Sequence, residues 1–73
     1  MQTETKKILV HINGQAQEVP AGLTVAALLE RYDLARRPLA VEINGDVVPR
    51  EKHAQRELQP GDRIEIVTLV GGG

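Results

Sequence analysis

Two asparagine–glycine pairs constrain this chain more than any other feature. Each pair, Asn13-Gly14 and Asn44-Gly45, follows a segment in which apolar residues occupy alternate positions. A two-residue hairpin of type I′ needs positive φ at both central positions, and asparagine followed by glycine tolerates this best. The sequence therefore predicts two β-hairpins, one in each half of the chain.

The first hairpin is predicted to join residues 8–12 to 15–19, and the second 39–43 to 47–48. In the first strand Ile8, Val10 and Ile12 share one face, which is typical of a half-buried strand. Pro20 ends this hairpin because proline has no N–H to donate to a neighbouring strand. A last strand is predicted over 64–70.

One helix is predicted between the hairpins. Thr24 is a suitable N-cap, and an apolar face follows at helical spacing, formed by Val25, Leu28, Leu29 and Tyr32. Residues 50–58 are predicted to hold one irregular helical turn. The order β-β-α-β-β-β predicts an α+β fold of the β-grasp type, one helix on a mixed sheet of four or five strands. Its predicted parts are a flexible N-terminal extension (1–6), the domain (7–70) and a flexible tail (71–73).

Composition limits the possible functions. The 73 residues suit one domain, and the absence of cysteine excludes disulfides and thiolate zinc sites, so aliphatic packing must stabilise the fold. A net charge of −1 argues against nucleic-acid binding, which requires a basic surface. No apolar run is long enough to span a membrane, and the first residues lack the apolar core of a signal peptide. A soluble cytoplasmic protein is expected.

The side chains offer little catalytic chemistry. The sequence contains no Ser-His-Asp arrangement, no phosphate-binding glycine loop and no cysteine nucleophile. His11 and His53 lie far apart in the sequence, and we interpret both as ordinary exposed histidines. The chain is therefore predicted not to be an enzyme, and to bind no metal or cofactor.

The chain ends on Gly71-Gly72-Gly73, directly after the last predicted strand. Such a run can be merely a flexible terminus. Alternatively, a tail without Cβ atoms is thin and reaches roughly 10 Å, so it could enter a narrow channel in a second protein. The carboxylate of Gly73 is then ionised at pH 7, and an enzyme would have to activate it with ATP. Composition alone favours neither interpretation.

The predicted sheet also has apolar residues on the face away from the helix. Val67 and Leu69 fall there, and Leu9 and Ala40 would join them if their strands were neighbours. Scattered apolar residues are common on protein surfaces, whereas a contiguous patch would indicate a partner. The sequence leaves these two interpretations about even.

Several motifs in a fixed order resemble the ThiS family, the sulfur carriers of thiamine biosynthesis. The most specific are INGDVVPR at 43–50, PGDRIEIV at 60–67 and the closing VGGG at 70–73. The segments INGQ at 12–15 and PAGLTVAALL at 20–29 agree as well. The resemblance covers residues 7–73.

This resemblance implies a function for the tail. A ubiquitin-activating-like adenylyltransferase would use ATP to adenylate the carboxylate of Gly73. A cysteine desulfurase or other persulfide donor would then supply sulfur to form a thiocarboxylate, which thiazole synthase would consume. Gly71 and Gly72 would form the rest of the tail. Val67 and Leu69 match the sheet surface by which such carriers dock on partners. Leu9 and Arg50 are the other residues predicted to bind partners, with a solvated loop arginine as the alternative interpretation of Arg50.

Three other functions remain open from the sequence. The chain could carry sulfur for molybdopterin synthesis, as the small subunit of that synthase. It could be a noncovalent ubiquitin-like interaction module with an inert tail. It could also be a ubiquitin-like modifier joined to lysines of target proteins. Appending one residue after Gly73 would abolish activation of a carrier and leave an interaction module unaffected.

Overall fold

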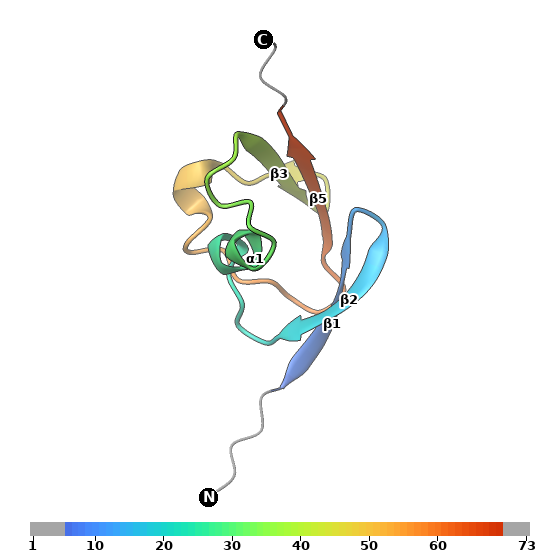
Figure 1. Ribbon diagram of the computed structural model, residues 1–73. Helices are drawn as coiled ribbons and strands as arrows, with labels where there is room; N and C mark the ends of the chain where they lie inside the picture. Colours follow the sequence, from blue (N-terminus) through green and yellow to red (C-terminus); the bar gives the residue numbers. More distant parts are fainter. Residues whose placement is uncertain (1–5, 70–73) are drawn as a thin grey trace, which may run out of the picture.

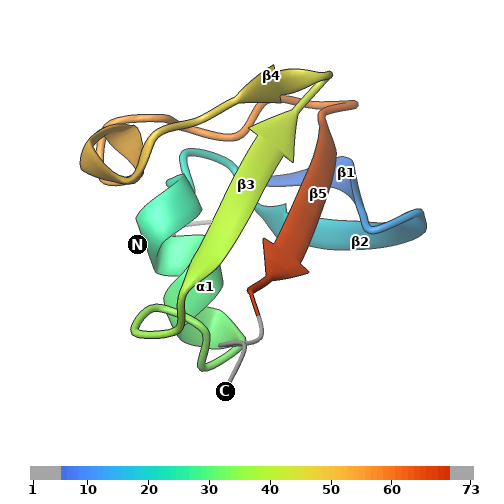
Figure 2. The same cartoon turned by 90° about the horizontal axis from the view of Figure 1, so that it is seen from above.

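The computed structural model describes residues 6–69 and contains five strands, one α-helix and one 3₁₀ turn (Figure 1). In chain order these are β1 (Lys7–Ile12), β2 (Gln15–Pro20), α1 (Val25–Arg31), β3 (Leu39–Ile43), β4 (Asp46–Val47), η1 (Arg50–Lys52) and β5 (Arg63–Thr68). The strands form one mixed sheet, and α1 lies against one of its faces (Figure 2). The predicted α+β class and element order are confirmed.

Both predicted hairpin turns are present. Asn13 and Gly14 have φ angles of 49° and 85°, and Asn44 and Gly45 have 55° and 89°. Positive φ at both central positions is the signature of type I′, whose twist matches that of the flanking strands. The turns therefore set the register of β1 on β2 and of β3 on β4.

Strand order, which the pattern left undetermined, is β2-β1-β5-β3-β4. β5 lies in the centre, parallel to β1 and antiparallel to β3. Its pairing with β1 is short, through His11 opposite Arg63 and Ile12 opposite Ile64. Its pairing with β3 runs through five residue pairs, from Ile43–Ile64 to Leu39–Thr68.

An entirely aliphatic core fills the space between the sheet and α1. Its buried members are Val10, Ile12, Val19, Val25, Leu28, Leu29, Val41, Ile43, Leu58, Ile64 and Ile66. The prediction of Tyr32 on the buried helix face is wrong, because α1 ends at Arg31 and Tyr32 is its C-cap, with φ −101° and ψ 8°. Its side chain is 43% exposed.

Thr24 caps the start of α1 as predicted. Its side-chain hydroxyl accepts the N–H of Ala27 at 3.1 Å, which satisfies one of the donors left unpaired in the first turn. The helix has only seven residues, so its stability depends on packing against the sheet.

The prediction that His53 is exposed is also wrong. The side chain is 6% exposed, and its Nε2 lies 3.0 Å from the carbonyl of Val48, which can only accept a hydrogen bond. The main-chain carbonyl of His53 accepts the N–H of Ala26 at 2.9 Å. His53 therefore connects the 3₁₀ turn both to Val48, the residue after β4, and to the start of α1.

Asp62 is the second buried polar residue, 5% exposed, just before β5. One carboxylate oxygen accepts from the Asn44 side-chain amide at 3.0 Å. The other accepts from the Gln59 N–H at 2.8 Å and forms an ion pair with Arg56 at 3.2 Å. All of its partners are hydrogen-bond donors, so the buried carboxylate is satisfied.

Candidate functional site

The candidate site is the end of β5, the strand that leads into the predicted tail. Pairing on the β3 side continues beyond Thr68, because the N–H of Leu69 donates to the carbonyl of Pro38 at 2.8 Å. β5 is therefore held by main-chain hydrogen bonds up to the last described residue. Val70 and the predicted tail, Gly71, Gly72 and Gly73, lie outside the described residues.

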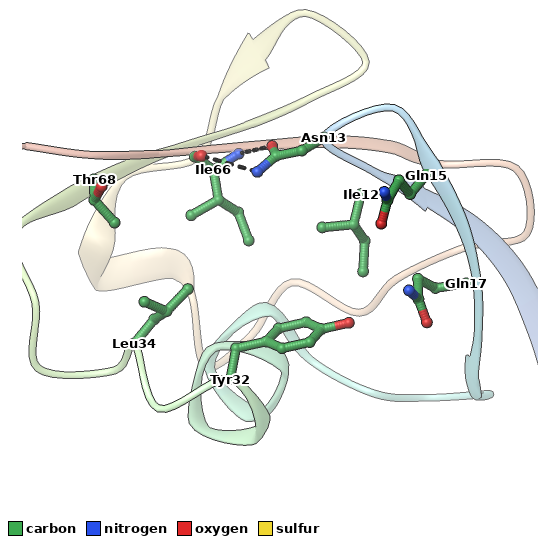
Figure 3. Close-up of a pocket in the computed structure, with 8 residues that line it drawn as sticks. All are labelled: Ile12, Asn13, Gln15, Gln17, Tyr32, Leu34, Ile66 and Thr68. Atoms are coloured by element: carbon green, nitrogen blue, oxygen red, sulfur yellow. Dashed lines mark hydrogen bonds between the residues drawn. The ribbon is translucent and has the colours of Figure 1, made fainter.

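The other edge of β5 is held by a side chain. β1 ends at Ile12, and the amide of Asn13 takes over its place: Oδ1 accepts the N–H of Ile66 at 2.8 Å, and Nδ2 donates to the Ile66 carbonyl at 3.3 Å (Figure 3). A side-chain amide has a carbonyl oxygen that accepts and an NH₂ group that donates, so it can replace a main-chain peptide group. Asn13 thus extends the short β1–β5 pairing by one position toward the end of β5.

The face of the sheet away from α1, here called the outer face, is apolar at this end. Val67 lies directly opposite Ala40 across the β3–β5 pair, and Leu69 is hydrogen-bonded opposite Pro38. The side chains of Val67 and Leu69 are 56% and 53% exposed. The condition for Ala40 to join Val67, that their strands be neighbours, is therefore met.

Leu9 does not join them. It is 49% exposed and opposite Glu18, and its carbonyl accepts the N–H of Gly61, before β5 begins. Val67 is six residues further along, about 20 Å at the usual rise per strand residue. The strands of Leu9 and Val67 are neighbours, yet Leu9 lies outside the patch, because β1 pairs only with the beginning of β5.

Arg50 lies close to the apolar end of the outer face. Its guanidinium donates to the carbonyl of Arg37 at 3.2 Å, and the next residue, Pro38, accepts the N–H of Leu69. Two hydrogen bonds thus connect Arg50 to the end of β5 through one short stretch of chain. Arg50 and Arg37 are both exposed, which adds positive charge to this end of the molecule.

The centre of the outer face is acidic. Glu42 and Glu65 are directly opposite each other on β3 and β5, and Val47, 66% exposed, is opposite Glu42 on the far side. Like charges at such positions destabilise a strand pair modestly. On the outer face, the carboxylates of Glu42 and Glu65 therefore lie between exposed Val47 at the edge and the apolar end of β5.

A groove opens on the other side of the sheet, between the end of β5 and the C-terminal end of α1 (Figure 3). Its volume is about 520 Å³, and its lining residues are Ile12, Asn13, Gln15, Gln17, Tyr32, Leu34, Ile66 and Thr68. In Figure 3 the Tyr32 ring lies below Ile12 with its hydroxyl directed toward Gln17. The lining combines aliphatic and uncharged polar side chains.

Sequence reasoning overlooked Asn13 and Tyr32 as features of the site, and Val47 as an exposed residue of the outer face outside it. Asn13 was interpreted only as a turn residue, and no local signal indicates a partner 53 positions away. The outward direction of Val47 could have been derived from alternation across the Asn44-Gly45 turn, since it lies opposite Glu42.

Within residues 6–69, no group of three or more histidine, cysteine or carboxylate side chains is arranged to hold a metal. No helix in the described part of the chain is long and apolar enough to cross a membrane.

Comparisons with known proteins agree on one family. The model of the ThiS family matches residues 10–73. The sulfur carrier protein ThiS of Escherichia coli is 43% identical over 84% of this chain and 92% of its own length. The crystal structure of the thiamine biosynthesis protein ThiS from Geobacter metallireducens is 30% identical, covers 90% of this chain and all of its own, and superposes with a TM-score of 0.77. This structural agreement confirms the β-grasp fold.

A third relative is larger. The thiazole synthase of Paramagnetospirillum magneticum is 42% identical over 85% of this chain, but the matched segment is 19% of its own length. The chain thus spans about a fifth of that protein.

Proposed function

Because the chain belongs to the ThiS family and is a sulfur carrier of thiamine biosynthesis, we propose that it carries the sulfur as a thiocarboxylate on Gly73. One observation supports this proposal above all. The family match extends to Gly73 itself, and the strand leading toward it is the central strand, held on one edge by β3 and on the other by Asn13. A rigid strand before a tail fixes where the tail begins.

The proposed chemistry takes place at the terminal carboxylate. The carboxylate is a poor acyl donor because it is ionised at pH 7. Attack of its oxygen on the α-phosphorus of ATP would release pyrophosphate and give an acyl adenylate. A persulfide sulfur would then displace AMP, and a thiol would cleave the resulting acyl disulfide to leave the thiocarboxylate. The carrier would be a co-substrate, with ATP and the catalytic groups held by its partners in the cytoplasm.

We assign three partners to this sequence of steps. The first is a ubiquitin-activating-like adenylyltransferase, and the second is a cysteine desulfurase or other persulfide donor. The third is thiazole synthase. Support for the third comes from the relative named thiazole synthase in which a segment similar to this chain is part of the same polypeptide. Covalent union of two functions is expected where the separate proteins must meet.

The apolar end of the outer face is the proposed docking surface for the adenylyltransferase. Val67 is exposed on β5 and Leu69 is exposed just after it, so an enzyme that takes up the tail must also cover them. Exposed aliphatic side chains on a rigid strand lose little entropy when a partner buries them. Arg50 stands near this surface, whereas Leu9 lies at the other end of the sheet and is the weakest of the four candidates.

Intact mass spectrometry tests the proposal. The protein is incubated with a ThiS-activating adenylyltransferase, ATP and a persulfide donor. We expect the mass to rise by the difference between sulfur and oxygen, on the peptide that ends in Gly73. A variant with one alanine appended after Gly73 should fold identically and remain unmodified. An unmodified wild-type protein that still binds the adenylyltransferase would contradict the carrier function.

A further inference from the structure

Residues 6–69 cover only part of the edge of β5 that faces β1. Successive residues of β5 direct their main-chain N–H and C=O groups to opposite edges of the strand. The carbonyl of Arg63 accepts the N–H of Asn44, and the N–H of Leu69 donates to the carbonyl of Pro38. The main-chain groups of odd-numbered residues therefore face β3. Ile64, Ile66 and Thr68 therefore direct their N–H and C=O groups the other way. Ile64 is paired with β1 and Ile66 with Asn13.

Thr68 is the next residue in this series. No partner for its N–H or its C=O lies among residues 6–69, since β1 ends at Ile12 and the Asn13 amide is already used by Ile66. Within the described part of the chain, these two groups form a short open edge at the end of β5. An exposed strand edge can accept another strand by main-chain hydrogen bonds.

The groove lies beside this open edge. Thr68 and Ile66 line it from β5, with Leu34 and Tyr32 across from them (Figure 3). A strand added along Thr68 would extend the line of β1, and every second side chain would point into the groove. Ile12, Leu34 and Ile66, which form the aliphatic floor of the groove, would contact this side chain.

The lining determines what kind of segment fits. Among the described residues it contains no charged side chain, so these residues offer nothing to neutralise a phosphate or a carboxylate. Aliphatic floor residues under a rim of Gln15 and Gln17 suit an uncharged, apolar side chain on an extended backbone. In strand addition, main-chain hydrogen bonds supply affinity and such side-chain pockets supply specificity.

We propose that the adenylyltransferase adds an extended segment to β5 at Thr68 and inserts an apolar side chain of that segment into the groove. This inference rests on the proposed function. The partner that takes up the tail must approach the end of β5, so its contact there would be continuous with the outer-face surface of Val67 and Leu69. The added strand would align the chain at the point where it enters the enzyme.

A matched pair of variants tests the groove. Gln17 faces the groove, whereas its neighbour Glu18 is opposite Leu9 on the outer face, and both are exposed on the edge strand β2. Gln17→Trp should obstruct the groove and raise the Kd for the adenylyltransferase by roughly tenfold, whereas Glu18→Trp should leave it unchanged. Both variants should keep the melting temperature of the wild type.

Hydrogen exchange of the Thr68 amide tests the added strand directly. In the free ¹⁵N-labelled protein this N–H should exchange quickly, and in the complex it should slow by roughly tenfold or more. Adenylation, measured by ATP–pyrophosphate exchange, tests the proposed function separately. Normal adenylation with an unprotected Thr68 and a wild-type Kd for Gln17→Trp would overturn the strand addition alone. No binding and no adenylation of the wild type would overturn both.

Discussion

The side chain of Asn13 and the main chain of Ile66 are hydrogen-bonded to each other twice, across 53 positions of sequence. The same residue forms the first hairpin turn, so one asparagine both reverses the chain and fixes the central strand. Asn44 repeats this arrangement in the second hairpin, where its Oδ1 accepts the N–H of Arg63 at 3.0 Å. Hairpin asparagines thus hold β5 at its first residue, Arg63, and at Ile66.

Asn13→Gly should separate the two roles of this residue. Glycine adopts the positive φ of the turn without strain, so only the two hydrogen bonds to Ile66 are lost. We expect the free energy of unfolding to fall by about 1–2 kcal/mol, because the main-chain groups of Ile66 lose partly buried partners. Urea unfolding, monitored by circular dichroism, measures the change in the free energy of unfolding.

Asn13→Asp is the second variant in this test. It keeps the acceptor for the Ile66 N–H but directs an oxygen at the Ile66 carbonyl, so it should also be destabilised. If both variants unfold at the same urea concentration as the wild type, the Asn13 side chain contributes nothing to holding β5.

His53→Ala should destabilise the fold far more than His11→Ala. The His53 ring is buried and bonded to the Val48 carbonyl, whereas His11 is half-buried on the outer face. Removing the ring leaves a cavity and a carbonyl without its partner, so we expect a loss of about 2–3 kcal/mol. Thermal unfolding of the two variants provides the comparison. Equal, small effects would mean that solvent replaces the His53 contact at no cost.

Local rules predicted most of the fold correctly. The turns at Asn13-Gly14 and Asn44-Gly45, the Thr24 cap and the alternation of buried residues are each decided within a few positions of sequence. Such features follow from backbone sterics and side-chain periodicity alone. Strand order does not, because it depends on which distant segments bury their apolar faces together.

The errors have the same origin. His53 lies in a polar stretch, and its burial results from the 3₁₀ turn that folds it beneath Val48 and against α1. Leu9 has the correct phase for the outer face, but the short parallel pairing of β1 with β5 separates it from Val67. In both cases the deciding contact is with a part of the chain that the local pattern does not specify.

Asp62→Ala should weaken the connection between the second hairpin and β5. The substitution leaves the Asn44 amide, the Gln59 N–H and the Arg56 guanidinium without their common acceptor. We expect a loss of about 2–4 kcal/mol, because a buried charge-assisted network is disrupted. Asp46→Ala, at an exposed aspartate of β4, is the control and should change the unfolding midpoint little. A similar midpoint for both variants would show that the Asp62 network is dispensable.

Val67→Lys should impair activation of the tail without unfolding the protein. Val67 is exposed, so the stability cost is small, but the lysine would place a charge within the proposed docking surface. A central interface contact is worth about 1–3 kcal/mol, so the KM for the carrier in ATP–pyrophosphate exchange should rise roughly tenfold or more. Val47→Lys is the matched control, an exposed valine of the same face beyond Glu42 and Glu65. Its KM should equal that of the wild type, and equal effects of the two lysines would place the docking surface elsewhere.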